Sequence, residues 1–315
     1  RRELVPACDP ELGRGLEDAA VLPGAERLVL TTDSYVIRPP VFPGGDLGRL
    51  AVCGTVNDLA MRGARPAYLT LGLIVEEGTE LSLLRTVMRS AAEACVEAGV
   101  ALVTGDFKVV ERGHGDGIFA NTAGVGFPRI EPPPSLTRAR PGDLIVINGP
   151  VGQHGVAILA ARGELTLAVT VESDCAPLAG LVGAMLEAGG EGVRTLHDPT
   201  RGGLAAALNE IAETSGVAIE VRERDFPRDS GVDGACDVLG LDPLQVANEG
   251  KLVAVIAPEA AAAVLAAMRA HQYGAPSAII GEVLEAPSGR VTLRTALGTR
   301  RIVDLPTGEL LPRIC

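Results

Sequence analysis

Acidic residues recur in the first half of the chain, at the ends of expected strands and in glycine-rich turns. Asp58 lies inside an otherwise apolar helical stretch, where an uncompensated carboxylate would be costly, so a metal ion or another cation is expected beside it. Carboxylates that converge on one point repel one another unless divalent cations neutralise them. Each residue alone is an ordinary cap or turn residue, but together they favour a Mg²⁺–nucleotide site. The four residues are Asp18, Asp33, Asp58 and Asp106.

Two side chains after Asp106 suggest how a phosphate could be held. Lys108 stands at the end of an expected buried strand, where it could neutralise a phosphate or position a reacting oxygen. A solvated lysine at a strand end is the alternative. His114 lies in the glycine-rich segment 113–117, which could lie over a ligand, although a lone histidine in such a loop is usually only solvated.

Two further motifs lie in the second half of the chain. The stretch 197–203, His-Asp-Pro-Thr-Arg-Gly-Gly, precedes an expected helix; such a turn suits an anion, although ordinary helices begin in the same way. The stretch 248–251, Asn-Glu-Gly-Lys, enters an apolar strand, and Glu249 could act as a general base if a neighbouring domain covers it. The chain contains neither a GxxxxGK[ST] phosphate loop nor a GxGxxG dinucleotide motif.

The last residue, Cys315, ends a tail that is too short to form a folded element. A thiol at the end of a chain can meet a donor on one protein, enter an active site and leave for an acceptor. Pro312 fixes its own φ and favours an extended conformation for the residue before it. Considered alone, the tail could equally be a frayed terminus that happens to end in cysteine.

The other cysteines do not form a metal-binding motif. None of the six cysteines lies within four residues of another, which excludes a zinc knuckle and a CxxC pair. Cys53 and Cys95 lie in apolar helical stretches and are expected to be small buried hydrophobic residues. This use of cysteine fits a reducing, cytoplasmic setting.

The composition narrows the class of protein. Of the 315 residues, 47% are hydrophobic, the mean hydropathy is +0.26, and there is no Trp. A net charge of −12 and few aromatic residues point away from nucleic acid and from anionic membranes. We find no signal peptide and no apolar run long enough to cross a bilayer. The chain begins at Arg1 without Met, which leaves room for a preceding segment.

The order of expected elements predicts a mixed α/β (α+β) fold of two domains. In the first half we expect strands over 27–32, 68–75, 100–104 and 118–125, and helices over 46–61 and 81–98. In the second half we expect strands over 144–147, 217–221, 252–256, 277–283 and 290–293, and helices over 155–161, 178–188, 203–214 and 259–270. The proline-rich stretch 128–142 is the best boundary. The predicted domains are 1–130 and 131–305, followed by a flexible tail over 306–315.

Several of these segments together resemble the HypE family of hydrogenase maturation factors, which are carbamoyl dehydratases of [NiFe]-hydrogenase assembly. The matching stretches are Thr-Thr-Asp-Ser-Tyr-Val over 31–36, Phe-Pro-Gly-Gly over 42–45, Cys-Gly-Thr-Val-Asn-Asp over 53–58, Val-Thr-Gly-Asp-Phe-Lys-Val-Val over 103–110, Asp-Pro-Thr-Arg-Gly-Gly over 198–203, Ala-Asn-Glu-Gly-Lys-Leu-Val over 247–253 and Pro-Arg-Ile-Cys over 312–315. The resemblance runs from about Asp18 to Cys315. The family's glycine-rich stretch of the type His-Gly-Ser-Gly-Gly has no match before Asp18.

The resemblance implies a fold like that of aminoimidazole ribonucleotide synthetase. The N-terminal half would form a homodimer whose sheets join across the two-fold axis, the C-terminal half would be α+β, and ATP would lie between the halves. The resemblance assigns Mg²⁺ and phosphate binding to Asp18, Asp33, Asp58 and Asp106. It adds Asn57, Asp198 and Asn248 to the ATP site. Lys108 and Glu249 match positions of the dehydration step, and His114 is a further candidate there.

The resemblance also implies a reaction. HypF would place a carbamoyl group on the Cys315 sulfur, the tail would fold into the site, and ATP would phosphorylate the carbamoyl oxygen. Loss of phosphate would leave a thiocyanate, whose nitrile passes to iron held by the HypC–HypD complex. The alternatives are a carrier of carbamoyl groups without catalysis and a kinase of the same fold, similar to thiamine-monophosphate kinase or selenophosphate synthetase. The sequence leaves open the tail conformation, the number of Mg²⁺ ions and the identity of the base.

Overall fold

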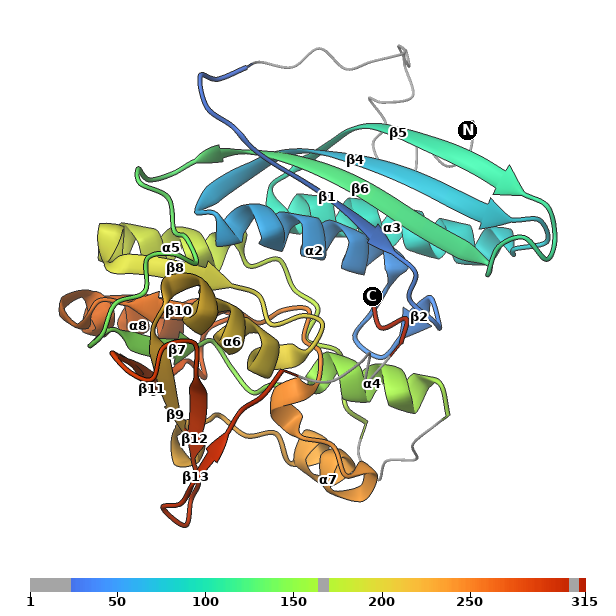
Figure 1. Cartoon of the computed structure of the whole chain (residues 1–315). Coiled ribbons are helices and arrows are strands. Elements are labelled where there is room, and N and C mark those ends of the chain that lie inside the picture. Colours follow the sequence, from blue (N-terminus) through green and yellow to red (C-terminus); the bar gives the residue numbers. More distant parts are fainter. Residues whose placement is uncertain (1–23, 164–169, 306–311) are drawn as a thin grey trace.

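The computed structural model describes residues 24–163, 170–305 and 312–315, which form two layered units, one above the other in Figure 1. The first unit is a four-stranded sheet in the order β1-β6-β4-β5. Its strands are β1 (Val29–Tyr35), β4 (Ala64–Glu76), β5 (Ala101–Val110) and β6 (Ile118–Pro128). Helices α2 (Leu47–Met61) and α3 (Leu81–Ala98) cover one face, and a short hairpin of β2 (Val41–Phe42) and β3 (Gly45–Asp46) leads into α2 (Figure 1).

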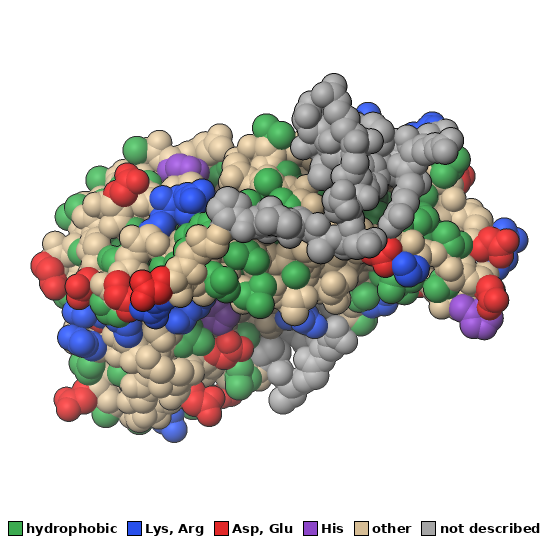
Figure 2. All heavy atoms as spheres, turned by 90° about the horizontal axis from the view of Figure 1, so that it is seen from above, with side chains coloured by type: hydrophobic (Ala, Val, Ile, Leu, Met, Phe, Trp, Pro, Cys, Tyr) green, Lys and Arg blue, Asp and Glu red, His purple; other side chains and the backbone are tan. Residues whose placement is uncertain are grey.

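The two faces of this sheet differ in burial. In β4, Leu71 and Leu73 point toward the helices and are 5% and 3% exposed, whereas Ile74 points the other way and is 46% exposed. Leu30 of β1 is likewise 66% exposed. Figure 2 looks onto this outer face and shows hydrophobic side chains at the surface between charged groups. A sheet with one apolar face uncovered is typical of a surface that another chain covers.

Helix α2 is almost completely buried between the first sheet, α3 and the second unit. Asp46 caps its N-terminus by accepting hydrogen bonds from Gly48 N (2.7 Å) and Arg49 N (3.2 Å). A Cβ on Gly48 would lie 1.9 Å from the carbonyl oxygen of Val87 in α3, so only glycine allows the two helices to cross this closely. The polar residues of α2 must therefore find partners inside the protein.

The second unit surrounds a seven-stranded sheet in the order β13-β12-β9-β11-β7-β10-β8. The strands are β7 (Leu144–Ile147), β8 (Val193–His197), β9 (Ala218–Arg222), β10 (Val253–Ile256), β11 (Ala278–Leu284), β12 (Val291–Arg294) and β13 (Arg300–Ile302). The helices are α4 (Gln153–Ala161), α5 (Ala179–Gly189), α6 (Gly203–Ser215), α7 (Ser230–Leu239) and α8 (Pro258–Ala270). One hydrophobic cluster contains side chains of both units, including Val56 of α2 and Met185 of α5.

Most elements expected from the sequence are present, and α3 and β7 have the expected bounds. The hairpin β2–β3, strands β8 and β13 and helix α7 were not predicted. The strand expected over 100–104 was predicted too short, because it continues to Val110. A Cβ on Gly105 would lie 2.4 Å from the carbonyl oxygen of Leu71, so this glycine lets β5 continue close beside β4. Among the described residues, no helix is long and apolar enough to cross a membrane.

Candidate active site

Four acidic side chains from distant parts of the sequence lie near enough for their charges to act on one another, where the first sheet faces the second unit. We call Asp33, Asp58, Asp198 and Glu249 the acidic cluster. Asp33 lies on β1, Asp58 on α2, Asp198 directly after β8 and Glu249 shortly before β10. Asp33 and Asp198 each raise the pKa of both Asp58 and Glu249, so the charges of the four residues act on one another. The fold therefore brings these four predicted residues together.

The ionised form of the Asp58 carboxyl is disfavoured, as its position in an apolar helical stretch predicted. Burial, followed by the negative charge of Asp198, raises the pKa of the Asp58 carboxyl to about 7. This occurs although Thr31 Oγ1 donates a hydrogen bond to Asp58 Oδ2 over 2.8 Å, which favours the ionised form. A carboxylate in this position gains stability from any cation that binds beside it.

His197 supplies one positive charge at the edge of the acidic cluster. Burial alone would lower its pKa, but hydrogen bonds and charge from Asp198 and Glu210 raise it to about 9. Its Nε2 donates to Glu210 Oε2 over 2.7 Å, and its Nδ1 lies 3.4 Å from Asp198 Oδ1. The pKa of Asp58 is still raised, so the imidazolium offsets only part of the negative charge of the acidic cluster.

Glu249 is suited to act as a base. The residue is 4% exposed, and burial, followed by the charges of Asp174 and Asp198, raises the pKa of its carboxyl well above the usual range. A raised pKa makes the ionised carboxylate a stronger proton acceptor, and a cation bound beside the acidic cluster would favour that ionised form. The neighbouring domain covers Glu249, as the sequence analysis required.

A buried ion pair fixes the main chain around Glu249. Lys251 Nζ donates to Asp174 Oδ2 over 3.0 Å, and Asp174 accepts from Glu249 N and Gly250 N, both over 3.2 Å. Burial would raise the pKa of Asp174, but the charges of Lys251 and His154 and the hydrogen bonds from Lys251 and Glu249 N together outweigh it and lower the pKa. A Cβ on Gly250 would lie 1.8 Å from the carbonyl oxygen of Asp174, so glycine is required here. Sequence analysis missed Asp174, because no motif connects it with Lys251.

The two predicted asparagines hold segments together with their side-chain amides. Asn57 Nδ2 donates to the carbonyl oxygens of Ala176 (3.1 Å) and Glu249 (3.3 Å), and Leu178 N donates to Asn57 Oδ1 over 2.8 Å. Asn248 Oδ1 accepts from Gly152 N, and its Nδ2 donates to the carbonyl oxygens of Pro199 and Val246. Both side chains therefore position the main chain around the cluster, and their direct contact with ATP remains a prediction.

The structure does not place Lys108 and Asp106 beside the acidic cluster. Their register against Ile74 and Gly72 puts both on the outer face of the first sheet, opposite the face that α2 covers. Lys108 Nζ pairs with Asp106 Oδ1 over 2.7 Å, and the two side chains are 68% and 56% exposed. Within this chain Lys108 lies away from Glu249, since β5 continues past Thr104 and turns Lys108 outward, and its part in the dehydration step stays a prediction.

The remaining predicted residues are placed differently. His114 lies in the loop between β5 and β6, where its side chain is 71% exposed and its Nδ1 is 3.9 Å from Glu111 Oε2. Asp18 lies outside the described residues. Cys53 and Cys95 are 0% and 6% exposed, which confirms them as buried residues.

The donor set of the acidic cluster fits Mg²⁺ chemically. Mg²⁺ prefers carboxylate oxygens, and Asp33, Asp58 and Asp198 offer them where their mutual repulsion favours a cation. Within the described ranges, no three His, Cys, Asp or Glu side chains already converge closely enough to form a complete metal site. Nucleotide phosphates commonly complete the coordination of Mg²⁺, so a carboxylate cluster without full convergence is compatible with such a site.

The last four residues lie against the body of the protein, between the end of β1 and α4 (Figure 1). Val36 N donates to the carbonyl oxygen of Cys315 over 3.0 Å, and Ile314 is 2% exposed. Val36 follows β1 and stands three residues after Asp33, so the same strand positions the acidic cluster and the end of the tail. The last four residues thus point inward, whereas the sequence had left the tail conformation open.

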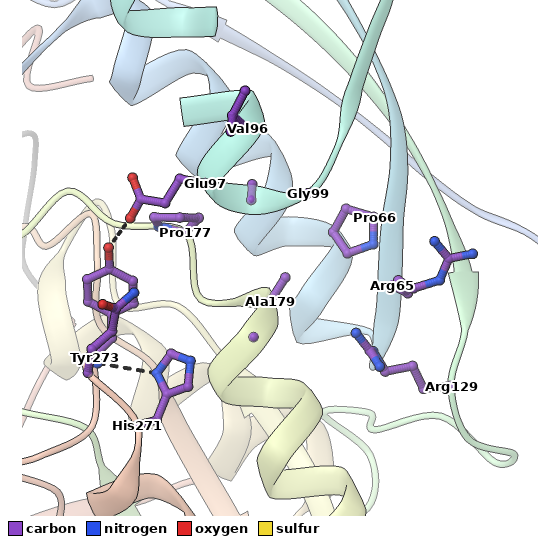
Figure 3. A pocket seen from close by; sticks show the side chains of 13 residues that line it. Arg65, Pro66, Val96, Glu97, Gly99, Arg129, Pro177, Ala179, His271 and Tyr273 are labelled. Atoms are coloured by element: carbon purple, nitrogen blue, oxygen red, sulfur yellow. Dashed lines mark hydrogen bonds between the residues drawn. The ribbon is translucent and has the colours of Figure 1, made fainter. Parts of the chain in front are cut away.

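A separate cavity of about 320 Å³ lies at another part of the interface between the two units (Figure 3). It is lined by the end of α3, the start of α5 and the loop that carries His271 and Tyr273. Figure 3 shows Tyr273 hydrogen-bonded to Glu97, and Arg49 Nη1 also donates to Glu97 over 2.7 Å. None of the residues predicted from the sequence as site residues lines this cavity, so we assign the chemistry to the acidic cluster.

Two family models match the chain. One, described as "AIR synthase related protein, N-terminal domain", matches residues 16–127, and the other, "AIR synthase related protein, C-terminal domain", matches residues 140–294. Among curated proteins, "Carbamoyl dehydratase HypE" of Rhodobacter capsulatus is 51% identical over 311 residues, covering 96% of this chain and 90% of the relative. A protein of the same name from Escherichia coli K12 is 44% identical over 300 residues, covering 95% and 88%.

Solved structures agree with these relatives. A structure of the hydrogenase maturation protein HypE matches with a TM-score of 0.95 at 47% identity and covers 99% of both chains. A HypE structure in complex with ATP matches with a TM-score of 0.94 at 47% identity, covering 99% of this chain and 94% of that chain. A HypE–HypF complex matches with a TM-score of 0.86 at 47% identity, covering 96% and 97%. A thiamine monophosphate kinase from Aquifex aeolicus, with a TM-score of 0.65 at 18% identity and coverage of 88% and 90%, shares the fold alone.

Proposed function

Because the chain belongs to the carbamoyl dehydratase HypE family, we propose that it uses ATP to dehydrate a carbamoyl group carried on its own Cys315 sulfur to a thiocyanate. The observation that carries this assignment is the position of Cys315. The last four residues are docked beside the end of the strand that bears Asp33, because Val36 N donates to the main-chain oxygen of Cys315. A relative with this fold binds ATP, which supports ATP as the second substrate.

The reaction needs one phosphoryl transfer and the loss of two protons. The carbamoyl oxygen of Cys315–S–C(=O)NH₂ attacks the γ-phosphorus of ATP, ADP leaves, and one N–H proton is lost. The C–O bond of this phosphorylated intermediate then breaks, phosphate leaves with the electron pair, and the second N–H proton is lost. The products are Cys315–S–C≡N, ADP and phosphate. Phosphorylation makes the oxygen a good leaving group, so the nitrile can form.

The residues of the cluster divide this work. Glu249 accepts an N–H proton, since its raised pKa makes its carboxylate a strong base. Asp174 and Asn57 hold the main chain of residue 249 in place. Asp33, Asp58 and Asp198 face the phosphates, with Asp18 and Asp106 as further proposed ligands. Bound to these carboxylates, Mg²⁺ would neutralise charge on the phosphoryl group that is transferred.

Lys108 and Asp106 enter the site in our proposal through a homodimer. In the strand order β1-β6-β4-β5, β1 and β5 are the outermost of the described strands, and open edges are commonly closed by pairing. If two sheets join across a two-fold axis, β5 of one chain lies beside β1 of the other. The partner's Lys108 would then lie close to β1, the strand that carries Asp33, and would support the transferring phosphoryl group from there. The exposed Leu30 and Ile74 would become buried in the same interface.

The first and the last step of the proposed reaction each need a partner protein. A carbamoyltransferase of the HypF kind would load Cys315, because a relative 47% identical to this chain forms a complex with HypF. The nitrile would pass to iron held by a HypC–HypD complex. No disulfide forms among the described cysteines, which supports a reducing, cytoplasmic location; they are Cys53, Cys95, Cys175, Cys236 and Cys315.

Replacing Glu249 tests the proposal. Glu249→Gln keeps the shape but cannot accept the proton, so carbamoylation of Cys315 should proceed while conversion to thiocyanate slows by about 10²–10⁴-fold. Single-turnover mass spectrometry of the C-terminal peptide would follow both forms. Conversion at the wild-type rate would remove Glu249 as the base and leave His114 as the next candidate. An unchanged carbamoyl group in the wild type after full exposure to ATP would instead indicate a carrier without catalysis.

A further inference from the structure

The docked C-terminal tetrapeptide is held through its main chain. Each of its four carbonyl oxygens accepts a hydrogen bond, from Arg162 Nη2 at Pro312 (2.8 Å) and Arg313 (2.6 Å), from His154 Nε2 at Ile314 (2.7 Å) and from Val36 N at Cys315 (3.0 Å). None of these four bonds involves the sulfur of Cys315. These four contacts therefore use main-chain oxygens, which do not change during a reaction at the thiol.

Arg162, at the C-terminal end of α4, joins two segments of main chain with one guanidinium group. Besides the two tail carbonyls, its Nε donates to the carbonyl oxygen of Arg38 over 2.7 Å, and Arg38 N donates to the carbonyl oxygen of Arg313 over 3.3 Å. A cavity of about 510 Å³ lies beside this junction and is lined by the same segments. A lysine could not make these bonds together, because it has a single nitrogen where arginine has a planar fork of donors.

His154 lies beneath the tail and is completely buried. Burial lowers the pKa of its imidazole, so the ring is neutral, and Ser173 Oγ donates to its Nδ1 over 2.8 Å. The proton of the neutral ring is thereby fixed on Nε2, where it is donated to the tail. Ser173 is itself held, because its N–H donates to the carbonyl oxygen of Pro43 over 2.8 Å and its Oγ accepts from Cys175 N over 3.2 Å.

Two side chains of the tail add selectivity. Ile314 is 2% exposed and belongs to the main hydrophobic cluster. Arg313 has a left-handed φ of 56°, which turns its side chain so that Nη1 pairs with Asp116 and Nε donates to the carbonyl oxygen of Val36 over 3.1 Å. Asp116 also lies 3.5 Å from Arg38 Nη1. The site therefore fits a basic residue followed by an apolar one before the terminal cysteine.

We propose that His154 and Arg162 are positioning residues that hold the C-terminal tail inward by its main chain, whatever group the Cys315 sulfur carries. This role rests on the proposed dehydration, in which the sulfur carries a carbamoyl group, a phosphorylated intermediate and a thiocyanate in turn. A site that recognised the thiol itself would release the tail as the group changed. Recognition of the main chain keeps the reacting carbon in place through both steps.

Hydrogen exchange tests the docking without any turnover. The amides of Val36 and Arg38 donate to tail carbonyls, so their exchange in the full-length protein reports whether the tail is docked. Arg162→Ala should speed exchange at both amides by about tenfold or more, because hydrogen bonds from charged donors are among the strong ones. In Arg162→Lys, both amides should exchange nearly as fast as in Arg162→Ala. Arg269→Ala is the matched control, since Arg269 Nε also donates to a main-chain carbonyl, at Ser277, away from the tail.

The same assay tests the role of His154 and the prediction that docking of the tail does not depend on the group that the Cys315 sulfur carries. His154→Leu should release both amides, and His154→Gln, whose amide can still donate, should restore part of the protection. Wild-type protein whose Cys315 is alkylated with iodoacetamide, which adds a carboxamide to the sulfur, should keep the protection. Wild-type exchange in Arg162→Ala, or release of the tail by alkylation alone, would overturn the proposal.

A single-turnover measurement separates this role from the proposed function. In Arg162→Ala, carbamoylation of Cys315 should proceed at least as fast as in the wild type, and conversion to thiocyanate should slow by about tenfold or more. If the variant released the tail but formed thiocyanate at the wild-type rate, His154 and Arg162 would not position the reaction. If the wild type formed no thiocyanate, the proposed function would fail while the exchange results would still establish the docking site.

Discussion

The raised pKa of Asp58 predicts a dependence of stability on pH that one substitution should abolish. The pKa of this carboxyl is raised from 3.8 to about 7, mainly by burial and by Asp198. In protein free of divalent cations, the neutral form is favoured by folding, so its contribution is present in full below pH 3.8 and is lost as the pH rises through 7. Asp58→Asn removes this titration and keeps an oxygen that accepts from Thr31 Oγ1.

The size of the effect follows from the shift. Raising the pKa of Asp58 from 3.8 to about 7 corresponds to about 1.4 kcal/mol for each tenfold change in proton affinity. The ionised carboxylate therefore lowers the free energy of unfolding above pH 8 by at most about 4 kcal/mol. Asp58→Asn should therefore unfold with nearly the wild-type free energy at about pH 3.5, below the ordinary pKa of 3.8, and the difference should already be between one and two kcal/mol, roughly, at pH 5. At pH 8.5 the variant should be more stable than the wild type by a few kcal/mol.

Urea unfolding in EDTA at a series of pH values measures this difference. Asp304→Asn, at an exposed aspartate after β13, is the control and should differ little from the wild type at any pH. Millimolar Mg²⁺ at pH 8.5 should stabilise the wild type more than Asp58→Asn, since the cation favours the ionised carboxylate. A stability difference that does not change with pH would refute this account of Asp58.

Three further outcomes follow from the contacts. Asn57→Ala removes three buried hydrogen bonds between the units and should lower the free energy of unfolding by about 3 kcal/mol in urea titrations; a loss within error of zero would show that they contribute nothing. Asp174→Asn leaves Lys251 buried without its partner and should cost about 3–5 kcal/mol by the same measurement, and restoration by Lys251→Met in the double variant would identify the uncompensated charge as the cause. Lys108→Ala and Glu249→Gln should each be inactive alone, but mixing the unfolded chains and refolding them should restore part of the thiocyanate formation, because a mixed dimer contains one intact site; no restoration would place Lys108 outside the partner's site.

The sequence predicted those elements whose patterns are local. Helix α3 is amphipathic and ends at Gly99, whose φ is 66°, so both its period and its stop are visible in the sequence. The short apolar run of β7 was equally clear. Strand β8 has the sequence Val-Arg-Thr-Leu-His, and two of its polar residues are satisfied by distant partners, since Arg194 pairs with Asp143 and Thr195 donates to Ser135. Helix α7 contains Gly231 and Gly234, which lower its intrinsic helix propensity.

The site was predictable where a residue type conflicted with its surroundings. A carboxylate in the apolar stretch of α2 and a glutamate before an apolar strand both pointed to the acidic cluster. The face of Lys108 was not predictable, because it depends on how far β5 extends beside β4 and on the register between the strands. His154 and Asp174 were missed for a similar reason, since their partners Ile314 and Lys251 lie 160 and 77 residues away in the sequence.

The central claim is that Cys315 carries the group that is dehydrated at the acidic cluster. The most direct measurement is a mass spectrum of the C-terminal peptide after incubation of the full-length protein with a HypF-type carbamoyltransferase, its carbamoyl donor and ATP. We predict a carbamoyl adduct on Cys315 when the ATP present cannot be cleaved, and a thiocyanate on the same residue when it can. We predict no adduct in Cys315→Ala. A thiocyanate on any other cysteine, or one that persists in Cys315→Ala, would contradict it.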